Sequence, residues 1–316
     1  MTRFLMRRLV TSVVSIFGAT IVVFSLVHLG PDPRQLFVPD SGYSMNQEQW
    51  ERLGKRLGFD KPFIVQYLNW VAKTFRGDLG VSLAQTRPVI DIIKGKIGAT
   101  LQLAIGGWIF AIMLGVSMGI VAAVKRGTVW DYFARSLAIV GIGLPAFVTG
   151  IFLILIFSVQ LQWLPAGTRP KDFDIRYFIM PCVALGWPAA AGLMRLVRTS
   201  MLDVLDAEYI KLARAKGVGY RTVIVKHALR NSLIAPLTSM LLLFANWLNG
   251  ALVVEVIFGW PGLGFTALFT AVNDNDFPVL LGTVFVFIMI FLVFSFLADI
   301  LYAVIDPRVR LGAEAG

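Results

Sequence analysis

Long runs of apolar residues, separated by polar stretches, dominate the chain. Six runs are long enough to cross a membrane as helices, because a hydrocarbon core of about 30 Å needs about 20 helical residues. They cover residues 9–29, 99–124, 134–161, 177–194, 233–257 and 278–305. The sequence therefore predicts an all-α membrane protein with six transmembrane helices. Pro145 in the third run, and Pro181 and Pro188 in the fourth, predict kinks.

The polar stretches divide the chain into four parts. We expect an N-terminal transmembrane helix in residues 1–30, an extracytoplasmic loop in residues 31–98, a five-helix core in residues 99–305 with a cytoplasmic loop at residues 195–231, and a cytoplasmic tail in residues 306–316. Within the first loop, residues 46–57 are predicted to form a short surface helix. Residues 63–75 have helical spacing and aromatic side chains that suit a membrane interface.

Composition and charge fit this class of protein. Hydrophobic residues make up 57% of the chain and charged residues 15%, whereas a soluble domain has about 45–50% and about 25%. The net charge of +10 comes from Lys and Arg between the apolar runs, where they set membrane orientation and do not indicate a nucleic-acid partner. Lys125, Arg126 and the cations of residues 195–231 place both termini in the cytoplasm. Arg169 and Lys171 run against that orientation.

The chain offers little with which to build a catalytic or metal site. Its two histidines are His28 and His227, its one cysteine is Cys182, and it contains no HExxH, GxSxG or GxxxxGK[ST] motif. Hydrolytic, metal and nucleotide-binding centres need such residues in such patterns. Charged residues within the predicted spans are also few, with Glu255 and Asp299 as the candidates. We therefore expect no enzyme, no cofactor and no metal site in this chain.

The cytoplasmic segment between the fourth and fifth runs carries the most informative pattern. Leu202, Leu205, Tyr209 and Leu212 recur at helical spacing, and Gly217 can end the helix in the left-handed conformation. A second amphipathic stretch follows from residue 220. One interpretation is a helix lying on lipid headgroups. The other is a docking element for a soluble protein, which would explain the small residues and the helix breaker.

Several short motifs carry a family resemblance, in the same order along the chain. They are residues 77–82 (GDLGVS), 163–167 (WLPAG), 209–217 (YIKLARAKG), 226–231 (KHALRN) with Pro236, 254–264 (VEVIFGWPGLG), and 299–302 (DILY) with 306–308 (DPR). Together with an Arg-Arg-Leu start, this order resembles permeases of ABC importers in the dipeptide, oligopeptide and nickel branch. The long first loop is similar to that of the B-type subunit.

The resemblance implies a type I ABC importer permease fold in the cytoplasmic (inner) membrane of a bacterium or archaeon. The implied partners are a second homologous permease subunit in a heterodimer, two ABC ATPase subunits that bind ATP and Mg²⁺, an extracytoplasmic substrate-binding protein and the lipid bilayer. The implied cargo is a dipeptide or oligopeptide; nickel chelates, glutathione and oligosaccharides are the alternatives. A secondary carrier or a membrane scaffold would be a function of another class, and neither explains the ordered motifs.

The resemblance also names two groups of candidate residues. The predicted ATPase-coupling loop consists of Glu208, Tyr209, Ala213, Arg214, Ala215, Lys216 and Gly217. The predicted periplasmic loop or outer gate consists of Glu255, Phe258, Trp260, Pro261, Gly262 and Gly264. For the second group an ordinary tight connection between two spans is an equal alternative. Catalytic, cofactor-binding and metal-binding residues are not expected.

Overall fold

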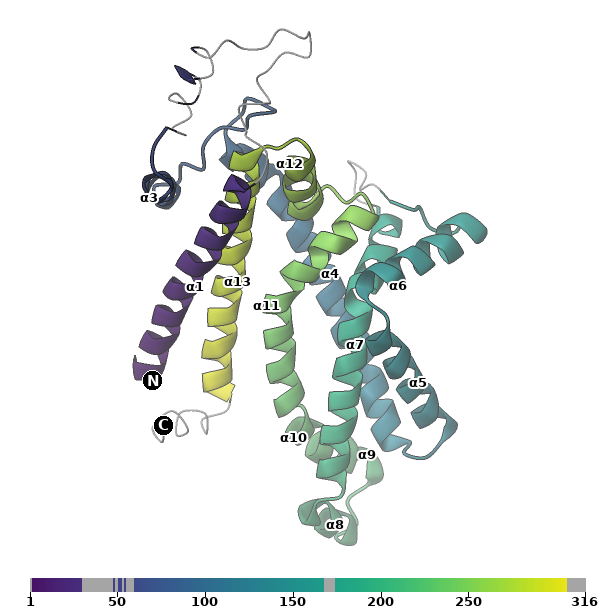
Figure 1. Ribbon diagram of the computed structural model, residues 1–316. Coiled ribbons are helices and arrows are strands. Elements are labelled where there is room, and N and C mark those ends of the chain that lie inside the picture. The colour runs from purple at the N-terminus through teal and green to yellow at the C-terminus, as the bar shows by residue number, and fades with distance from the viewer. Residues whose placement is uncertain are drawn as a thin grey trace. The chain divides into compact units, whose positions relative to one another are not determined.

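A computed structural model describes residues 2–29, 60–167 and 174–305, with Glu48, Glu51, Arg52 and Gly54 as isolated positions. The described residues form a succession of helices, three of them π-helical (Figure 1). The first half contains α1 (Thr2–His28), α3 (Phe63–Phe75), α4 (Val89–Val124), α5 (Val129–Gly143), α6 (Ala146–Leu153) and η2 (Ile154–Gln160). The second half contains α7 (Arg176–Leu205), α8 (Glu208–Ala215), α9 (Tyr220–Thr222), η3 (Val223–Leu229), α10 (Arg230–Ser232), α11 (Ile234–Ile257), η4 (Leu263–Phe269), α12 (Thr270–Asn273) and α13 (Phe277–Ile305).

Each predicted span coincides with helical structure, but several boundaries differ. Among the described residues, three helices are long and apolar enough to cross a membrane: Val89–Val124, Arg176–Leu205 and Phe277–Leu297. Helices α1 and α11 lie at the positions of the predicted first and fifth spans. The predicted helix at residues 63–75 is confirmed as α3. The predicted helix at residues 46–57 lies largely outside the described residues, and the tail at residues 306–316 lies wholly outside them.

The predicted start of the second span at residue 99 is wrong, because α4 begins ten residues earlier. Val89 follows Pro88, and a proline at the start of a helix needs no hydrogen-bonded N–H. Val89 and Ile93 are buried, so burial of this first part stabilises the helix although Lys94 and Lys96 make it polar in sequence. The assignment of residues 31–98 to an extracytoplasmic loop stays a prediction.

The third span is not one helix over residues 134–161, as the sequence suggested. Between Val129–Gly143 and Ala146–Gln160 the helix direction bends by 109°, which is far more than a kink within one helix. Leu144 adopts an extended conformation with φ −104° and ψ 119°, which is the conformation that a following proline favours. Pro181 and Pro188, in contrast, lie within α7 without ending it. Counted as one broken span, the bent pair makes a fourth crossing segment.

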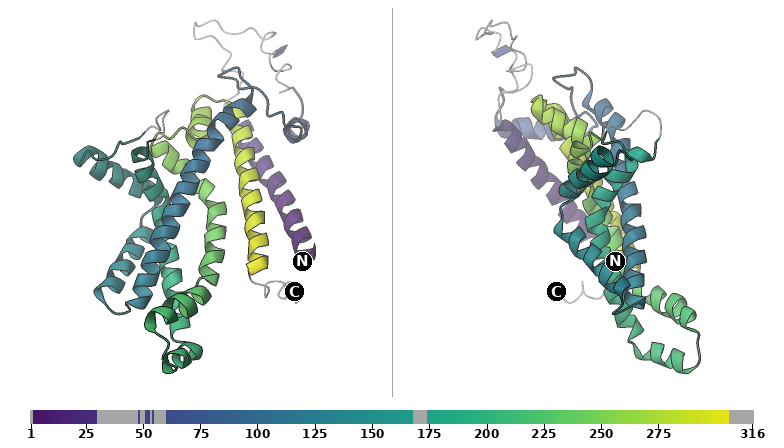
Figure 2. Two further views of the ribbon diagram at one scale, coloured as in Figure 1. Left: turned by 180° about the vertical axis from the view of Figure 1, so that it is seen from behind. Right: turned by 90° about the vertical axis from the view of Figure 1, so that its right-hand side faces the viewer.

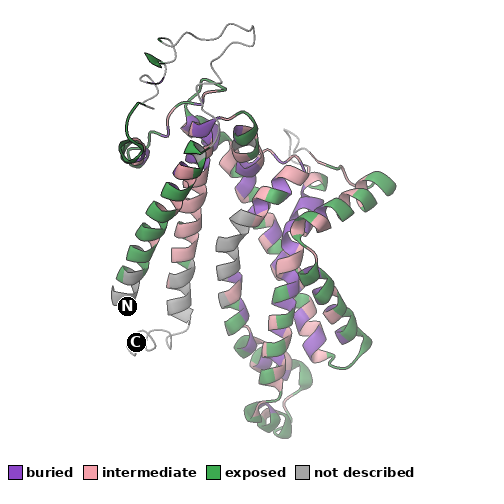
Figure 3. Cartoon of the chain, viewed as in Figure 1, coloured by how far each residue is buried: buried purple, intermediate pink, exposed green. Residues whose placement is uncertain are grey.

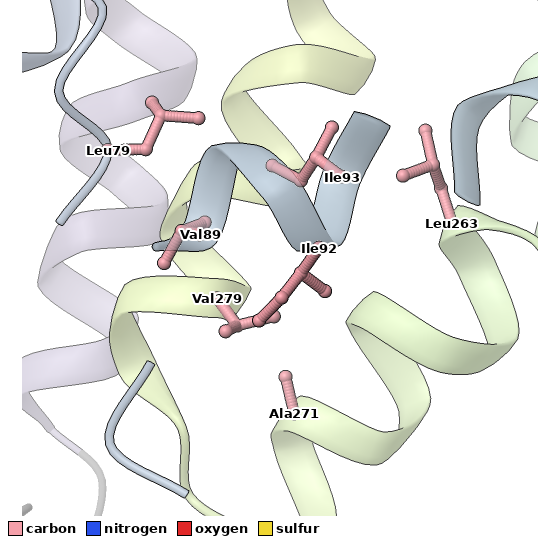
Figure 4. Packing of buried hydrophobic residues seen from close by; sticks show 7 residues of the cluster. All are labelled: Leu79, Val89, Ile92, Ile93, Leu263, Ala271 and Val279. Atoms are coloured by element: carbon pink, nitrogen blue, oxygen red, sulfur yellow. The ribbon is translucent and has the colours of Figure 1, made fainter. Parts of the chain in front are cut away.

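The chain divides into two compact units, and the first consists of residues 1–99 and 262–292. Its core joins the start of α4 to η4, α12 and α13 (Figure 4), with Leu79, Val89, Ile92, Ile93, Leu263, Ala271 and Val279 as buried members. Asp276, just before α13, fixes the loop that precedes α4. It accepts hydrogen bonds from the Ser82 hydroxyl, from the Leu83 N–H (3.2 Å) and from the Ala84 N–H (3.3 Å). The GDLGVS motif is therefore tied to the start of α13.

The second unit, residues 100–261 and 293–316, is organised around α7, in which 13 of the described residues are buried (Figure 3). Helices α4 and α7 approach closely through glycines. A Cβ atom added to Gly115 would lie 2.8 Å from the Ala190 carbonyl oxygen, and one added to Gly119 would lie 2.7 Å from Val197 Cβ. Small residues let two apolar helices pack backbone to backbone. Gly115 and Gly119 form a GxxxG pattern that predicts such a contact from sequence.

Candidate coupling site

The segment between α7 and α11 folds into a compact helical turn at one end of α7, opposite the end that carries α6 (Figure 2). The single amphipathic helix suggested by Leu202, Leu205, Tyr209 and Leu212 is wrong, because the chain turns at Ala207. There α7 has ended at Leu205, and α8 begins at Glu208. Leu202 and Leu205 pack in the core of the second unit, whereas Leu212 is 60% exposed on α8.

Gly217 ends α8 in the manner that its sequence predicts. Its φ is +80°, a left-handed conformation that costs other residues about 1–2 kcal/mol. The N–H of Gly217 donates to the Arg214 carbonyl (3.0 Å), and the N–H of Val218 donates to the Ala213 carbonyl (3.1 Å). These two bonds form a Schellman cap, which satisfies carbonyls that the helix end leaves free. A Cβ atom on Gly217 would meet nothing within 4 Å, so backbone conformation alone demands glycine.

Helix α8 is anchored by one side and exposed on the other. Ile210 is fully buried, and α8 contacts η3. Tyr209 is 45% exposed, and its hydroxyl accepts a hydrogen bond from the Asn231 side-chain N–H at 3.2 Å. Glu208 receives a hydrogen bond from Lys211 Nζ at 2.7 Å. Of the remaining predicted coupling residues, one is half-buried and three are exposed: Ala213, Arg214, Ala215 and Lys216.

A buried ion pair, which the sequence interpretation missed, braces α7 close to this site. Arg198 Nε donates to Asp131 Oδ1 at 2.8 Å and Arg198 Nη2 donates to Asp131 Oδ2 at 3.0 Å. The Asp131 side chain is only 3% exposed and also accepts the Gly127 N–H at 3.0 Å. A second pair, Arg126 with Asp206 at 3.3 Å, lies on the surface. The turn between α4 and α5 is thus fastened to the part of α7 that leads into α8.

The predicted outer-gate residues of the second unit are buried by packing within that unit. Glu255, near the end of α11, is fully buried and accepts a hydrogen bond from Thr100 Oγ1 at 2.6 Å. Phe258 and Trp260 are each 1% exposed. The Trp260 ring meets the Phe178 ring edge to face, with ring centroids 4.7 Å apart. Pro261 is half-buried.

The remaining two gate candidates belong to the first unit. Gly262 and Gly264 are both buried, and Gly262 precedes the first residue of η4. Leu263 between them lies in the core cluster of that unit. The outer gate and the ordinary tight connection between two spans both stay predictions.

The site between α7 and α11 presents an exposed helix surface. The described residues hold no group of three or more His, Cys, Asp or Glu side chains placed to bind a metal ion. What the site presents is a short helix, capped at its C-terminal end by Gly217, whose exposed side mixes apolar and basic residues.

Comparison with known proteins assigns the chain to a family over almost its whole length. Residues 115–311 match the family described as binding-protein-dependent transport system inner membrane component, and residues 1–104 match the N-terminal part of such membrane components. The dipeptide transport system permease protein DppB of Alkalihalophilus pseudofirmus is 38% identical over 336 residues, which cover 98% of this chain and 100% of the relative. The glutathione transport system permease protein GsiC of Shigella flexneri is 37% identical over 311 residues, or 98% and 99% of the two chains.

A solved structure supports the fold. The crystal structure of an amino acid ABC transporter with histidines superimposes with a TM-score of 0.51 at 21% identity, over 67% of this chain and 93% of that one. At that identity the likeness speaks for the fold alone. Together with the family match and the two relatives, it completes the assignment: the chain belongs to the family of inner-membrane permease components of binding-protein-dependent transport systems.

Proposed function

We propose that the chain is the B-type permease subunit of an ATP-driven importer for dipeptides or oligopeptides. Two similar permeases are named for dipeptide and glutathione transport, and glutathione is itself a small peptide. Nickel chelates and oligosaccharides remain the alternative cargoes. In this proposal a second permease subunit forms a heterodimer with this chain and completes the translocation path for the cargo. An extracytoplasmic binding protein delivers the cargo.

The observation that carries the coupling role is the structure of α8. Its exposed face includes Tyr209 and Leu212, and its end is fixed by the cap at Gly217. A helix that is anchored on one side and rigidly ended can transmit a displacement to the helix that carries it. We infer that α8 docks on one of two ATPase subunits in the cytoplasm, and that these subunits bind the ATP and Mg²⁺.

The distribution of charge supports an orientation with α8 on the cytoplasmic side of the membrane. Residues 125–126 and 195–231 carry a high density of Lys and Arg, and such segments stay in the cytoplasm. Both chain termini then lie in the cytoplasm, and the 63–88 region lies outside. ATP binding can drive transport only if the nucleotide-bound ATPase dimer has different affinities for two permease conformations.

Transport in a reconstituted system tests the cargo. Proteoliposomes would hold this chain with its permease, ATPase and binding-protein partners, with ATP in the lumen where the ATPases face inward. Mass spectrometry would identify the compounds that accumulate in the lumen after exposure to mixed peptides, sugars and nickel chelates. We expect peptides to accumulate only when ATP and the binding protein are both present. Uptake without ATP would refute the importer assignment.

A matched pair of variants tests the coupling helix. Leu212→Lys places a charge on the exposed face of α8, and we expect the ATPase subunits to stop co-purifying with the permease. Ile175→Lys is the control, because Ile175 is similarly exposed at 58% but precedes α7 at its other end. Retention of ATPase binding and uptake by Leu212→Lys would refute docking through this face.

A further inference from the structure

Helix α3 has three distinct faces, and only two of them suit water or the protein core. At 3.6 residues per turn, the first face contains Tyr67, Trp70, Val71 and Thr74, which are buried or half-buried. The second face is polar, with Asn69 and Lys73 exposed and Gln66 half-buried. The third face is exposed and apolar, with Ile64, Val65, Leu68, Ala72 and Phe75.

The first face is packed against α1 and α13 within the first unit. Tyr67, Phe24 of α1 and Leu281 of α13 form one buried cluster. The Tyr67 hydroxyl lies 3.0 Å from Thr20 Oγ1, and the Trp70 ring meets the Phe285 ring edge to face at 6.2 Å. The orientation of α3 is therefore fixed, and its third face is held outward.

The exposed apolar face is large for a segment outside the membrane core. Ile64 is 67% exposed, and Leu68 and Phe75 are each 57% exposed. Transfer of these side chains out of water is favourable in proportion to the apolar area that is buried. Helices with a wide apolar face beside a polar face, and basic residues at the edges, are typical of membrane interfaces.

The place of α3 along α13 matches the depth of such an interface. Figure 1 shows α3 along its axis, whereas α13 is seen from the side, so α3 runs across the direction of α13. Leu281 and Phe285, which α3 contacts, lie about 6 Å and about 12 Å along α13 from its first residue at 1.5 Å per residue. With the bilayer boundary taken at Phe277, where the apolar segment of α13 begins, these distances are comparable to the depth of about 5–10 Å at which interfacial helices sit.

The apolar face also continues a surface that α1 exposes. The Phe75 ring lies 6.3 Å from the Phe17 ring, and α1 exposes Val14 (65%), Ile21 (41%) and Val22 (56%). A helix whose residues are apolar and exposed over most of its length is suited to lipid contact. The two helices therefore form one continuous lipid-facing surface.

We propose that α3 lies in the outer leaflet of the membrane, with Ile64, Leu68 and Phe75 among the lipid acyl chains and Asn69 and Lys73 toward the headgroups and water. The outward side of the membrane follows from the proposed orientation of the chain. In this position α3 holds the outer end of α1 against α13 and fixes the depth at which both helices cross. The occupant of the third face is thus lipid and not a protein subunit.

Nitroxide labels on the assembled transporter in proteoliposomes test this placement. Leu68→Cys and Asn69→Cys would be made in a Cys182→Ala background, and Val14→Cys would serve as the lipid-exposed reference on α1. We expect the label at Leu68→Cys, like the reference, to collide severalfold more with oxygen than with a water-soluble nickel complex. The label at Asn69→Cys should show the opposite preference. In a separate unlabelled sample, the free thiol of Asn69→Cys should react with an impermeant maleimide added on the binding-protein side.

Three results would overturn the proposal. A label at Leu68→Cys that prefers the nickel complex would place the third face in water. A label screened from both reagents would mean that a protein subunit covers this face. Reaction of Asn69→Cys only from the ATPase side would refute the outer-leaflet position. None of these measurements uses cargo or ATP, so a failure of the peptide-import proposal would be seen separately.

Discussion

Removing Arg198 from the buried ion pair should loosen the packing around α7 by a measurable amount. Arg198→Met leaves the Asp131 carboxylate, which is 3% exposed, without its two closest charged donors. Breaking a buried pair costs about 3–5 kcal/mol. Arg198 is 21% exposed and Arg135 Nε remains 3.5 Å from Asp131, so we expect about 2–3 kcal/mol.

Cys182 provides the assay. It is the one cysteine of the chain, it is 9% exposed in α7, and its Sγ would lie 2.6 Å from a Cβ atom added to Gly106 of α4. A thiol-reactive dye can therefore reach Cys182 only when α4 and α7 separate. When opening is fast relative to labelling, the rate follows the population of the open state. A loss of about 2–3 kcal/mol should raise the rate about 30-fold to 140-fold, since 1.4 kcal/mol is a factor of ten.

The control is the exposed pair of Arg126 with Asp206, in which the side chains are 62% and 70% exposed. Exposed pairs contribute about 0–1 kcal/mol, so Arg126→Met should raise the rate about fivefold at most. The double variant Asp131→Asn/Arg198→Met should be less damaged than the sum of its single variants, because the two residues interact directly. Equal labelling rates in Arg198→Met and Arg126→Met would refute the argument that burial makes the difference.

Glycine substitutions test three further features, each read with the same thiol-labelling assay or with uptake. Gly119→Ala should cost about 1–3 kcal/mol of stability, because its Cβ would also lie 2.9 Å from a carbonyl oxygen of α7. Gly192→Ala, which meets open space, should instead stabilise α7 by about 0.5–1 kcal/mol. Equal effects of the two substitutions would contradict the close approach of α4 and α7 at Gly119. Gly167→Ala should likewise speed labelling, because its Cβ would lie 2.5 Å from the Phe258 carbonyl oxygen; an unchanged rate would speak against this approach. Gly217→Ala should reduce ATP-driven uptake, and Gly217→Asn should reduce it less, since Asn tolerates the left-handed conformation; the reverse order would exclude backbone conformation as the cause.

The helices were predictable because apolar periodicity and helix breakers act locally. Residues 63–75 and the cap at Gly217 are examples, since a single amphipathic turn pattern and a single glycine specify them. The count of six spans stays a prediction, because three helices of the described residues, or four segments with the bent pair as one, are long and apolar enough to cross a membrane.

The errors arose where tertiary contacts outweigh local pattern. The start of α4 looked polar because of Lys94 and Lys96, yet Val89 and Ile93 are buried by η4, α12 and α13. The bend at Leu144 depends on how α5 and α6 each pack on α7, and Pro181 shows that a proline alone does not decide the outcome. The pair of Asp131 with Arg198 joins residues 67 positions apart, so no local pattern could reveal it.

The glycine contacts between α4 and α7 make this helix pair stiff along its length. At Gly115 and Gly119 no side chain of α4 stands between its backbone and α7, so no rotamer change of α4 can absorb a small displacement there. A slide of α4 by one helical turn, about 5.4 Å, would bring Ala111 to the place of Gly115 or Ala123 to the place of Gly119. A Cβ atom there would lie 2.8 Å from the Ala190 carbonyl oxygen or 2.7 Å from Val197 Cβ. A displacement applied at α8 should therefore pass from α7 to α4, and these two helices should move together as a rigid body.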